Sequence, residues 1–364
     1  MISPKPKESI MQIKPYVGGK SKADGAQRII KLSSNENPWG PSPKAIAAFE
    51  AASKNLNRYP DGGHGQLRET ISKIHGFSEN ELICGSGSDE LIGLLIHAFA
   101  GKGDEVLYSQ YGFLMYKIYT LSNEATPVTA PERNLHFDVD AVLAAVSERT
   151  KIVFIANPNN PTGTYITFSE IKRLRAGLRE DIILALDAAY AEYMEVADYD
   201  TGHDLVTDTN TIVFHTFSKI YGLPALRLGW AHGPANIIDA MNRIRSPFNV
   251  TSPALAAGVA ALNDAGFVLE QRAKNTIERK RVCDTLSQLG LTFVRSYTNF
   301  VLVNFGSVQK ALEANQFLTQ HGLIVRDTVA YGLPEYLRIS FGTSEENNLL
   351  TQALSDFVAS KKAT

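Results

Sequence analysis

Short apolar runs that do not alternate with polar residues constrain the fold of this chain more than any other feature. Strands buried on both faces are typical of such runs, because helices cover both sides of their sheet. Helical stretches separate the runs, and one begins with the capping-box pattern T-F-S-E at 167–170. Alternating β and α segments predict an α/β fold with a mostly parallel sheet. The six expected strands lie at 81–84, 105–108, 151–156, 181–186, 211–217 and 228–232.

The pattern changes near residue 250, where the chain becomes Ala-rich and helical to about residue 281. Shorter elements follow, and a length of 364 residues suits about two domains. We expect an N-terminal segment at 1–43 that packs with the small domain, a large domain at 44–250 and a small C-terminal α+β domain at 251–364. The late elements expected are strands at 292–294, 300–304, 323–326 and 336–341, with helices at 308–321 and 344–360.

Charge and cysteine usage exclude several classes of protein. Lys plus Arg total 36 and Asp plus Glu total 38, so the net charge of −2 offers no strong field to nucleic acid or to an anionic membrane. No apolar run approaches the roughly 18 residues of a spanning helix, and the first residues lack the apolar core of a signal peptide. The two cysteines, Cys84 and Cys283, show no C-x-x-C spacing, which favours a reducing compartment and a cytoplasmic protein. The histidines form no H-E-x-x-H motif, and no metal is expected.

Charged side chains follow two of the expected strands. Lys219 comes after the run at 211–217, and Asp187 closes the run at 181–186. Open α/β sheets bind ligands at this carboxyl edge, where desolvation would lower the pKa of the lysine. Taken singly, Lys219 is as well explained by a solvated loop, and Asp187 is better explained by a helix cap or a structural ion pair. Together they are the pair that pyridoxal phosphate requires, a lysine for the Schiff base and an acid for the ring nitrogen.

Two loops carry further candidates. The loop N-P-N-N-P-T-G at 157–163 is either a plain turn or a means of presenting an asparagine to a ring oxygen. The loop G-S-G-S-D-E at 85–90 precedes a helix, where free backbone N–H groups bind phosphate, although a tight loop with a Ser or Asp N-cap is the better explanation of this loop alone. It is neither the dinucleotide fingerprint nor a Walker motif. Arg227 would supply a cation for the same phosphate.

In this combination the chain resembles the histidinol-phosphate aminotransferases, which belong to the fold type I group of pyridoxal-phosphate enzymes. The resemblance covers nearly the whole chain. It implies a large domain with a mostly parallel sheet that binds pyridoxal 5'-phosphate, plus a smaller α+β domain. The motifs that carry it are K-L-S-S-N-E-N-P at 31–38, R-Y-P-D-G at 58–62, the loop at 157–163, T-F-S-K-I-Y-G-L at 216–223, I-V-R-D at 324–327, Y-G-L-P at 331–334 and Y-L-R-I-S at 336–340.

The resemblance also implies roles for individual residues. Lys219 would form the Schiff base and then move a proton between the substrate and cofactor carbons. Asp187 would pair with the ring nitrogen, and Tyr190 and Asn160 would hydrogen-bond the phenolic oxygen of the ring. The other implied cofactor contacts are Phe113 against the ring, Gly87, Ser88, Asp89, Ser218 and Arg227 at the phosphate, and Tyr59 reaching that phosphate from the partner subunit. The implied assembly is therefore a homodimer with shared active sites.

For the substrates the resemblance implies Arg338 as the main anchor, with Arg326, Tyr16 and Asn37 completing the pocket. The implied activity converts imidazole acetol phosphate and L-glutamate to L-histidinol phosphate and 2-oxoglutarate in histidine biosynthesis, by ping-pong transfer through the pyridoxamine form. One departure is D-A-A-Y at 187–190, where many members have D-E-A-Y, and it leaves the specificity open. The alternatives are an aromatic or broad-specificity aminotransferase, a decarboxylase of threonine phosphate and a non-enzymatic cofactor-binding regulator.

Overall fold

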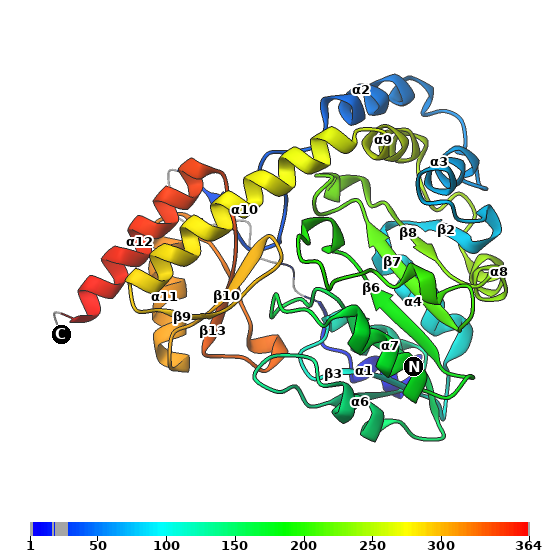
Figure 1. Ribbon diagram of the computed structural model, residues 1–364, viewed down its shortest axis with the longest axis horizontal. Helices are drawn as coiled ribbons and strands as arrows, with labels where there is room; N and C mark the ends of the chain where they lie inside the picture. The colour runs from blue at the N-terminus through cyan, green and yellow to red at the C-terminus, as the bar shows by residue number, and fades with distance from the viewer. Residues whose placement is uncertain (1–2, 17, 19–27, 363–364) are drawn as a thin grey trace.

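Seven strands form the central sheet of the computed structural model, which describes residues 3–16, 18 and 28–362. Their order is β2-β8-β7-β6-β5-β3-β4 (Figure 1). Only β8 runs antiparallel to its neighbours in this sheet, which confirms the mostly parallel α/β prediction. The strands are β2 (Leu82–Gly85), β3 (Glu105–Ser109), β4 (Thr126–Ala130), β5 (Thr150–Ala156), β6 (Ile183–Asp187), β7 (Thr211–Thr216) and β8 (Gly229–His232).

Strand β4 was not predicted, because its sequence lacks a continuous apolar run. It lies at the edge of the sheet beside β3 alone, and four of its five residues, Pro127 among them, are partly buried or exposed. Proline is tolerated on an edge strand, where one row of backbone groups has no strand partner. The position of this segment at the edge of the sheet therefore allows it to form a strand, although its hydrophobic pattern does not predict one.

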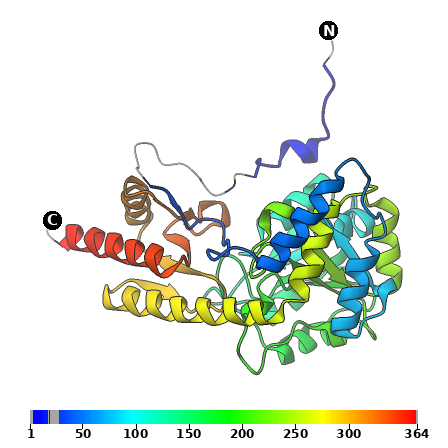
Figure 2. The ribbon, with the colours of Figure 1, turned by 90° about the horizontal axis from the view of Figure 1, so that it is seen from above.

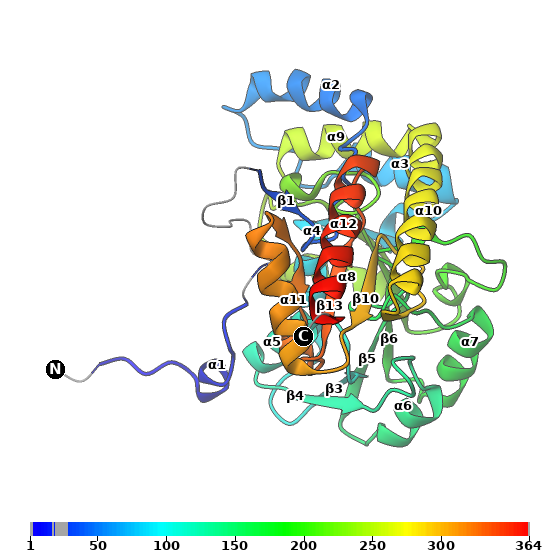
Figure 3. The same cartoon turned by 90° about the vertical axis from the view of Figure 1, so that its left-hand side faces the viewer.

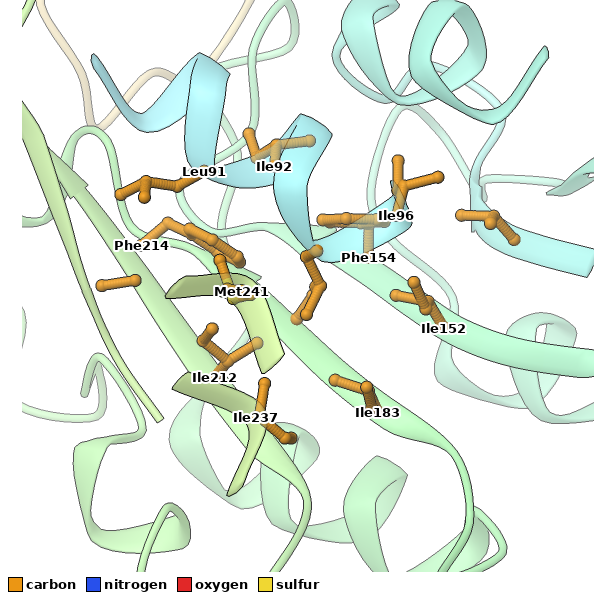
Figure 4. Close-up of a cluster of buried hydrophobic side chains, with 14 of the residues drawn as sticks. Leu91, Ile92, Ile96, Ile152, Phe154, Ile183, Ile212, Phe214, Ile237 and Met241 are labelled. Atoms are coloured by element: carbon orange, nitrogen blue, oxygen red, sulfur yellow. The ribbon is translucent and has the colours of Figure 1, made fainter. Parts of the chain in front are cut away.

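Helices cover both faces of this sheet, which explains the continuous apolar runs. Phe154 of β5 points into the cluster beneath α4 and α8, whereas its neighbour Val153 joins the cluster on the opposite face (Figure 4). One face carries α4 (Gly87–Phe99), α5 (Leu114–Ser122) and α8 (Ala235–Ile244), and the other carries α6 (Val139–Ala145) and α7 (Phe168–Gly177). The Thr167 side chain caps α7 by accepting from the Glu170 N–H at 3.3 Å, so the predicted capping residue is confirmed.

A third group of helices packs beside β2 and β8. It comprises α2 (Pro43–Ala52), α3 (Gly65–His75) and α9 (Ser252–Leu262), whose alanines meet Leu67 and Phe217. Helix α9 thus lies with the large sheet, although the expected division at 250/251 assigns it to the small domain. The long helix α10 (Ala265–Gln288) carries the chain from there to the second sheet (Figure 1).

The second sheet is antiparallel and has the order β12-β13-β10-β9. Its strands are β9 (Thr292–Val294), β10 (Phe300–Asn304), β12 (Arg326–Asp327) and β13 (Tyr336–Ser340). Helices α10, α11 (Val308–Gln320) and α12 (Ser344–Lys362) gather on one face and bury its apolar side chains (Figure 3). The expected strand at 323–326 is divided, because β11 (Leu323–Ile324) leaves this sheet and pairs in parallel with β1 (Ile30–Lys31).

The N-terminal segment contacts both parts of the molecule. Strand β1 joins β11, and the backbone N–H of Ser340 donates to Leu32 O at 2.9 Å. Helix α1 (Glu8–Met11) lies on the side of α5, where Lys7 pairs with Glu124 at 2.8 Å, and the described residues before it point away from the body (Figure 2). Residues 1–2, 17 and 19–27 of the expected segment, and 363–364 at the other end, lie outside the described residues.

Short 3-10 helices complete the fold at Ser53–Asn55 (η1), Glu79–Glu81 (η2), Ala191–Tyr193 (η3), His203–Leu205 (η4), Pro224–Leu226 (η5) and Val329–Tyr331 (η6). No single helix among the described residues has the length and apolarity to cross a membrane. Helices α9 and α10 meet that test only as a pair bent by 77°, by length and composition alone.

Candidate active site

A cavity of about 350 Å³ opens at the carboxyl edge of the parallel strands. Strands β5, β6 and β7 end there, and β2 leads into the first turn of α4 at the same edge. Most of the residues that the sequence analysis singled out meet at this cavity although they are far apart along the chain. Those in its lining are Tyr16, Ser88, Asp89, Phe113, Asn160, Asp187, Tyr190, Ser218, Lys219 and Arg227.

Lys219 stands three residues after the last residue of β7. Its Nζ donates to the carbonyl oxygen of Ser34 at 3.3 Å. Burial lowers the pKa of Lys219 to about 8, and the positive charge of Arg338 adds to this effect. With a pKa of about 8, roughly one tenth of this amine is unprotonated at pH 7, far more than in an ordinary lysine, and a nucleophile and proton carrier needs this free amine.

Asp187 is the last residue of β6 and is buried. Burial raises its pKa, while hydrogen bonds from the Tyr116 hydroxyl at 2.8 Å and the Ala189 N–H at 3.3 Å act in the opposite direction. A buried carboxylate held by neutral donors favours a cationic partner such as a protonated ring nitrogen. Tyr116 was not predicted. Its one sequence signal is its place three residues after Phe113, which puts both side chains on one side of the chain at the start of α5.

The first turn of α4 and Arg227 form a cradle for an anion. Gly87 has φ +82°, and a Cβ there would lie 2.5 Å from Arg227 Nη2. A Cβ on Gly229 would lie 2.3 Å from the backbone N of Ser88, so the sheet approaches the helix start as closely as glycine permits. Arg227 Nη1 donates to Ser218 Oγ at 3.3 Å, which fixes the guanidinium beside the free N–H groups of the helix. This donor set fits a phosphate.

The opposite side of the cavity carries hydrogen-bonding groups for a ring oxygen. Arg338 of β13 donates through Nη1 to Asn160 Oδ1 at 2.5 Å and through Nη2 to Ser33 O at 2.8 Å. Because the Asn160 oxygen is engaged, its amide N–H groups remain for a ligand. Asn35 Nδ2 donates to the Tyr190 hydroxyl at 2.8 Å, a contact that the sequence analysis did not predict.

Two arginines lie directly opposite each other on neighbouring strands of the small sheet. Arg326 of β12 is the register partner of Arg338 of β13. The hydrogen bonds of Arg338 within the described chain go to neutral oxygens, and its Nε is buried without a partner there. The Arg326 guanidinium lies 5.9 Å from the centre of the Tyr16 ring. Like charges opposite each other destabilise a sheet, so this pair favours an anionic ligand.

Five predicted residues lie elsewhere than in the cavity lining: the opposed arginines Arg326 and Arg338 of the small sheet, and three others. Gly87 lies against Arg227, and its lack of a side chain leaves room for the guanidinium in the anion cradle. Asn37 donates its amide N–H to Ile220 O at 2.8 Å and accepts from the Trp39 N–H at 3.1 Å, so it braces the loop after Lys219, and its substrate contact stays a prediction. Tyr59 is 82% exposed and stacks on Phe248 with 4.6 Å between ring centres.

Among the described residues, no group of His, Cys, Asp and Glu side chains has the geometry of a metal site. The chemistry of the cavity fits pyridoxal phosphate instead, because it combines a lysine amine, a buried carboxylate and an anion cradle around one space. The sequence missed residues whose contacts depend on packing. They are Tyr116 and Asn35, the lining residues Met115, Ala156, Pro158, Ala189 and Pro224, and Thr216, whose Oγ1 accepts from the Ser218 N–H at 3.1 Å.

This fold and this set of groups define an aminotransferase that uses pyridoxal phosphate. The family model described as "Aminotransferase class I and II" matches residues 27–354, and the chain belongs to that family. Its curated relatives carry a more particular name. "Histidinol-phosphate aminotransferase" of Rhodopseudomonas palustris (strain TIE-1) is 52% identical over 362 residues, which cover 98% of this chain and 99% of the relative. The protein of that name from Paramagnetospirillum magneticum is 51% identical over 98% of this chain and 99% of its own length.

A solved structure agrees with these relatives. The histidinol-phosphate aminotransferase from Sinorhizobium meliloti in complex with pyridoxal-5'-phosphate superposes with a TM-score of 0.91. The match covers 99% of both chains at 27% identity. The fold type I prediction and the pyridoxal-phosphate prediction are thereby confirmed.

Proposed function

We propose that this aminotransferase converts imidazole acetol phosphate and L-glutamate to L-histidinol phosphate and 2-oxoglutarate, a reaction of histidine biosynthesis. The names of the relatives support histidinol phosphate as one of the substrates. The observation that carries it here is the opposed pair Arg326 and Arg338, which adjoins the cavity lining through the Tyr16 ring and the Asn160 side chain. A paired guanidinium site suits a phosphate or a carboxylate, and the two amino donors present one or the other.

The cofactor-binding roles are part of the proposal. Pyridoxal phosphate, when bound, supplies an electron sink that stabilises negative charge on the substrate carbon. Asp187 would keep the ring nitrogen protonated, Asn160 and Tyr190 would donate to the ring oxygen, and Phe113 would pack against the ring. The first turn of α4, at Ser88 and the backbone of Asp89, would hold the phosphate together with Ser218 and Arg227.

Lys219 serves as both attachment point and proton carrier. A pKa of about 8 allows its amine to accept a proton from the substrate carbon and to return it. Arg338 binds the oxyanion of the substrate while holding Asn160, so substrate binding and ring-oxygen contact share one guanidinium. Arg326 adds a second cation where a phosphate needs it, and the Tyr16 ring closes the pocket beside it.

We also propose a homodimer with shared active sites. Tyr59 and Phe248 stack on each other, with exposed fractions of 82% and 43%, and an exposed apolar pair of this kind suits a contact with a second copy. From that position Tyr59 would reach the phosphate of the partner. The described part of the N-terminal arm leaves the body and suits the same role (Figure 2).

We also propose where the protein is located, what it binds and which segments hold the cofactor and the substrate. The free cysteines suit a cytoplasmic location, and the balanced charge suits small-molecule substrates rather than nucleic acid or a membrane. We propose that residues 44–250, together with α9, hold the cofactor. The segment 1–43 and the remainder of 251–364 then supply the substrate arginines and their supports.

A single-turnover experiment tests the substrate assignment. Cofactor-loaded protein is mixed separately with L-histidinol phosphate, L-glutamate, L-phenylalanine and L-tyrosine, and the absorbance of the bound cofactor is followed. We expect fast conversion with the first two and slow conversion with the aromatic amino acids. A Lys219→Ala variant is the control, because it keeps the cradle and loses the attacking amine.

The contrary outcomes are specific. Equal or faster conversion with phenylalanine or tyrosine would indicate an aromatic or broad-specificity aminotransferase. Release of carbon dioxide from threonine phosphate would indicate a decarboxylase. Cofactor binding without conversion by any donor would indicate a regulator.

A further inference from the structure

We propose that Asn35 is a positioning residue that directs the hydroxyl proton of Tyr190 toward the ring oxygen of the cofactor. The inference rests on the proposed function, in which Tyr190 donates a hydrogen bond to that oxygen. Asn35 itself is absent from the cavity lining and acts through Tyr190.

The backbone of Asn35 is held firmly in place. The residue is 1% exposed and has φ +56°, a left-handed conformation that asparagine tolerates better than most residues. Its N–H donates to Ser340 Oγ at 2.9 Å, and its carbonyl oxygen accepts from Asn299 Nδ2 at 3.0 Å. Both partners belong to the small-sheet region, so the position of Asn35 depends on how that region meets the N-terminal segment.

Ser340 determines which way the Asn35 amide faces. Ser340 Oγ already accepts from the Asn35 N–H, and it donates its own hydrogen to Asn35 Oδ1 at 3.0 Å. Because the oxygen is engaged there, the amide nitrogen is the atom that lies 2.8 Å from the Tyr190 hydroxyl. An amide nitrogen has hydrogens to give and no free lone pair, so the Tyr190 oxygen accepts in this bond.

The proton of Tyr190 is thereby excluded from the bond with Asn35. Tyr190 is 3% exposed and lines the cavity together with Lys219 and Asn160. Its hydroxyl proton is left to donate into the cavity, and a hydroxyl that also accepts a hydrogen bond is polarised to donate more strongly. The chain of donors has one direction, from Ser340 through Asn35 and Tyr190 to the ring oxygen.

An isosteric substitution reverses this direction. In Asn35→Asp the side chain becomes an acceptor, so the Tyr190 hydroxyl donates to it and turns away from the cavity. Aspartate also tolerates the left-handed backbone. We expect the pH midpoint of the bound cofactor's absorbance change to rise by roughly one unit, a tenfold change in the proton equilibrium, because the ring oxygen loses a donor that stabilises its anionic form.

The double variant separates proton direction from simple charge. Tyr190→Phe alone should raise the same midpoint, and adding Asn35→Asp to it should produce no further rise. A rise caused by Asn35→Asp that persists undiminished in the Tyr190→Phe background would show a through-space charge effect and overturn the proposal. No rise in Asn35→Asp alone would overturn it as well. If Tyr190→Phe itself leaves the midpoint unchanged, the proposed role of Tyr190 fails, and that result is distinct from a failure at Asn35.

Two further variants guard against misfolding. Asn35→Gly keeps the left-handed backbone and removes the amide, so we expect a rise smaller than in Tyr190→Phe, since the hydroxyl is free to rotate. An unchanged midpoint in Asn35→Gly would also contradict the proposal. Asn299→Ser is the matched control, because it removes the bond to the Asn35 carbonyl without touching the donor chain. It should lower the melting temperature and leave the midpoint unchanged.

Discussion

Tyr116→Phe gives a direct test of how the protein controls the ring nitrogen of the cofactor. The Tyr116 hydroxyl donates to Asp187 Oδ2 at 2.8 Å, and both side chains are buried. A hydrogen bond donated to a carboxylate favours its ionised form, so removing this bond raises the pKa of Asp187 further above its ordinary value. The ring of phenylalanine fills the same space, so the substitution removes the hydrogen bond and preserves the packing.

The magnitude follows from the type of bond. A hydrogen bond to a charged group contributes about 1.5–3 kcal/mol, and about 1.4 kcal/mol is a factor of ten in an equilibrium constant. The proton shared between Asp187 and the ring nitrogen should therefore shift toward the carboxyl by roughly 10- to 150-fold. The loss of ring protonation weakens the electron sink, and kcat should fall with it.

The assay is nitrogen NMR of the protein loaded with ring-labelled pyridoxal phosphate, because the chemical shift reports the protonation of that nitrogen. Tyr119→Phe is a matched control on the same helix, since the Tyr119 hydroxyl donates to Asp89 Oδ2 at 3.0 Å instead. We expect a shift toward the unprotonated form in Tyr116→Phe alone. A resonance that is the same in Tyr116→Phe as in the parent protein would refute the reasoning.

Three other substitutions probe the remaining parts of the site. Lys219→Met should stabilise the cofactor-free protein by about 3 kcal/mol at pH 7, because burial lowers the lysine pKa from 10.5 to about 8 and the folded state carries an unfavourable ammonium below that pH. The advantage should decline as the pH rises from 8 toward 10.5, which calorimetry at pH 7 and 9.5 checks; an advantage that stays constant with pH would exclude this cause. Arg326→Lys should raise the KM for L-histidinol phosphate more than that for L-glutamate, whereas Arg338→Lys should raise both KM values. Steady-state kinetics with each donor checks this, and equal effects of the two substitutions would contradict the separate roles of the two arginines. Gly87→Ala should weaken cofactor binding about tenfold or more in equilibrium dialysis, because it adds about 1–2 kcal/mol of backbone strain and displaces Arg227. Gly76→Ala is the control, because Gly76 has a similar φ of +78° and open space around it. If Gly76→Ala weakens cofactor binding equally, backbone strain alone explains the result for Gly87→Ala.

Much of the cofactor side of the site could be predicted from the sequence. Lys219 and Asp187 follow apolar runs, and in a parallel sheet the ends of such runs meet at one edge. Gly87 and Ser88 stand where a strand passes into a helix, which is a local signal for an anion site. The predicted ends of the strands differ from the observed ends by about one or two residues, because the hydrophobic pattern does not show where backbone pairing stops. The hydrogen bond from the Asn37 amide to the loop after Lys219 depends on tertiary packing and was not predicted.

By itself the sequence therefore determined the class of fold, the cofactor and the residues at the strand ends, because these depend on local hydrophobic pattern and spacing. Tertiary structure alone decided which distant groups touch. Tyr116 reaches Asp187 across 71 positions, and Asn35 reaches Tyr190 across 155. Arg326 faces Arg338 only because β12 and β13 pair in that register. Such contacts depend on strand order and helix packing, which bring distant residues together. The local sequence around each residue does not indicate which partner it will contact.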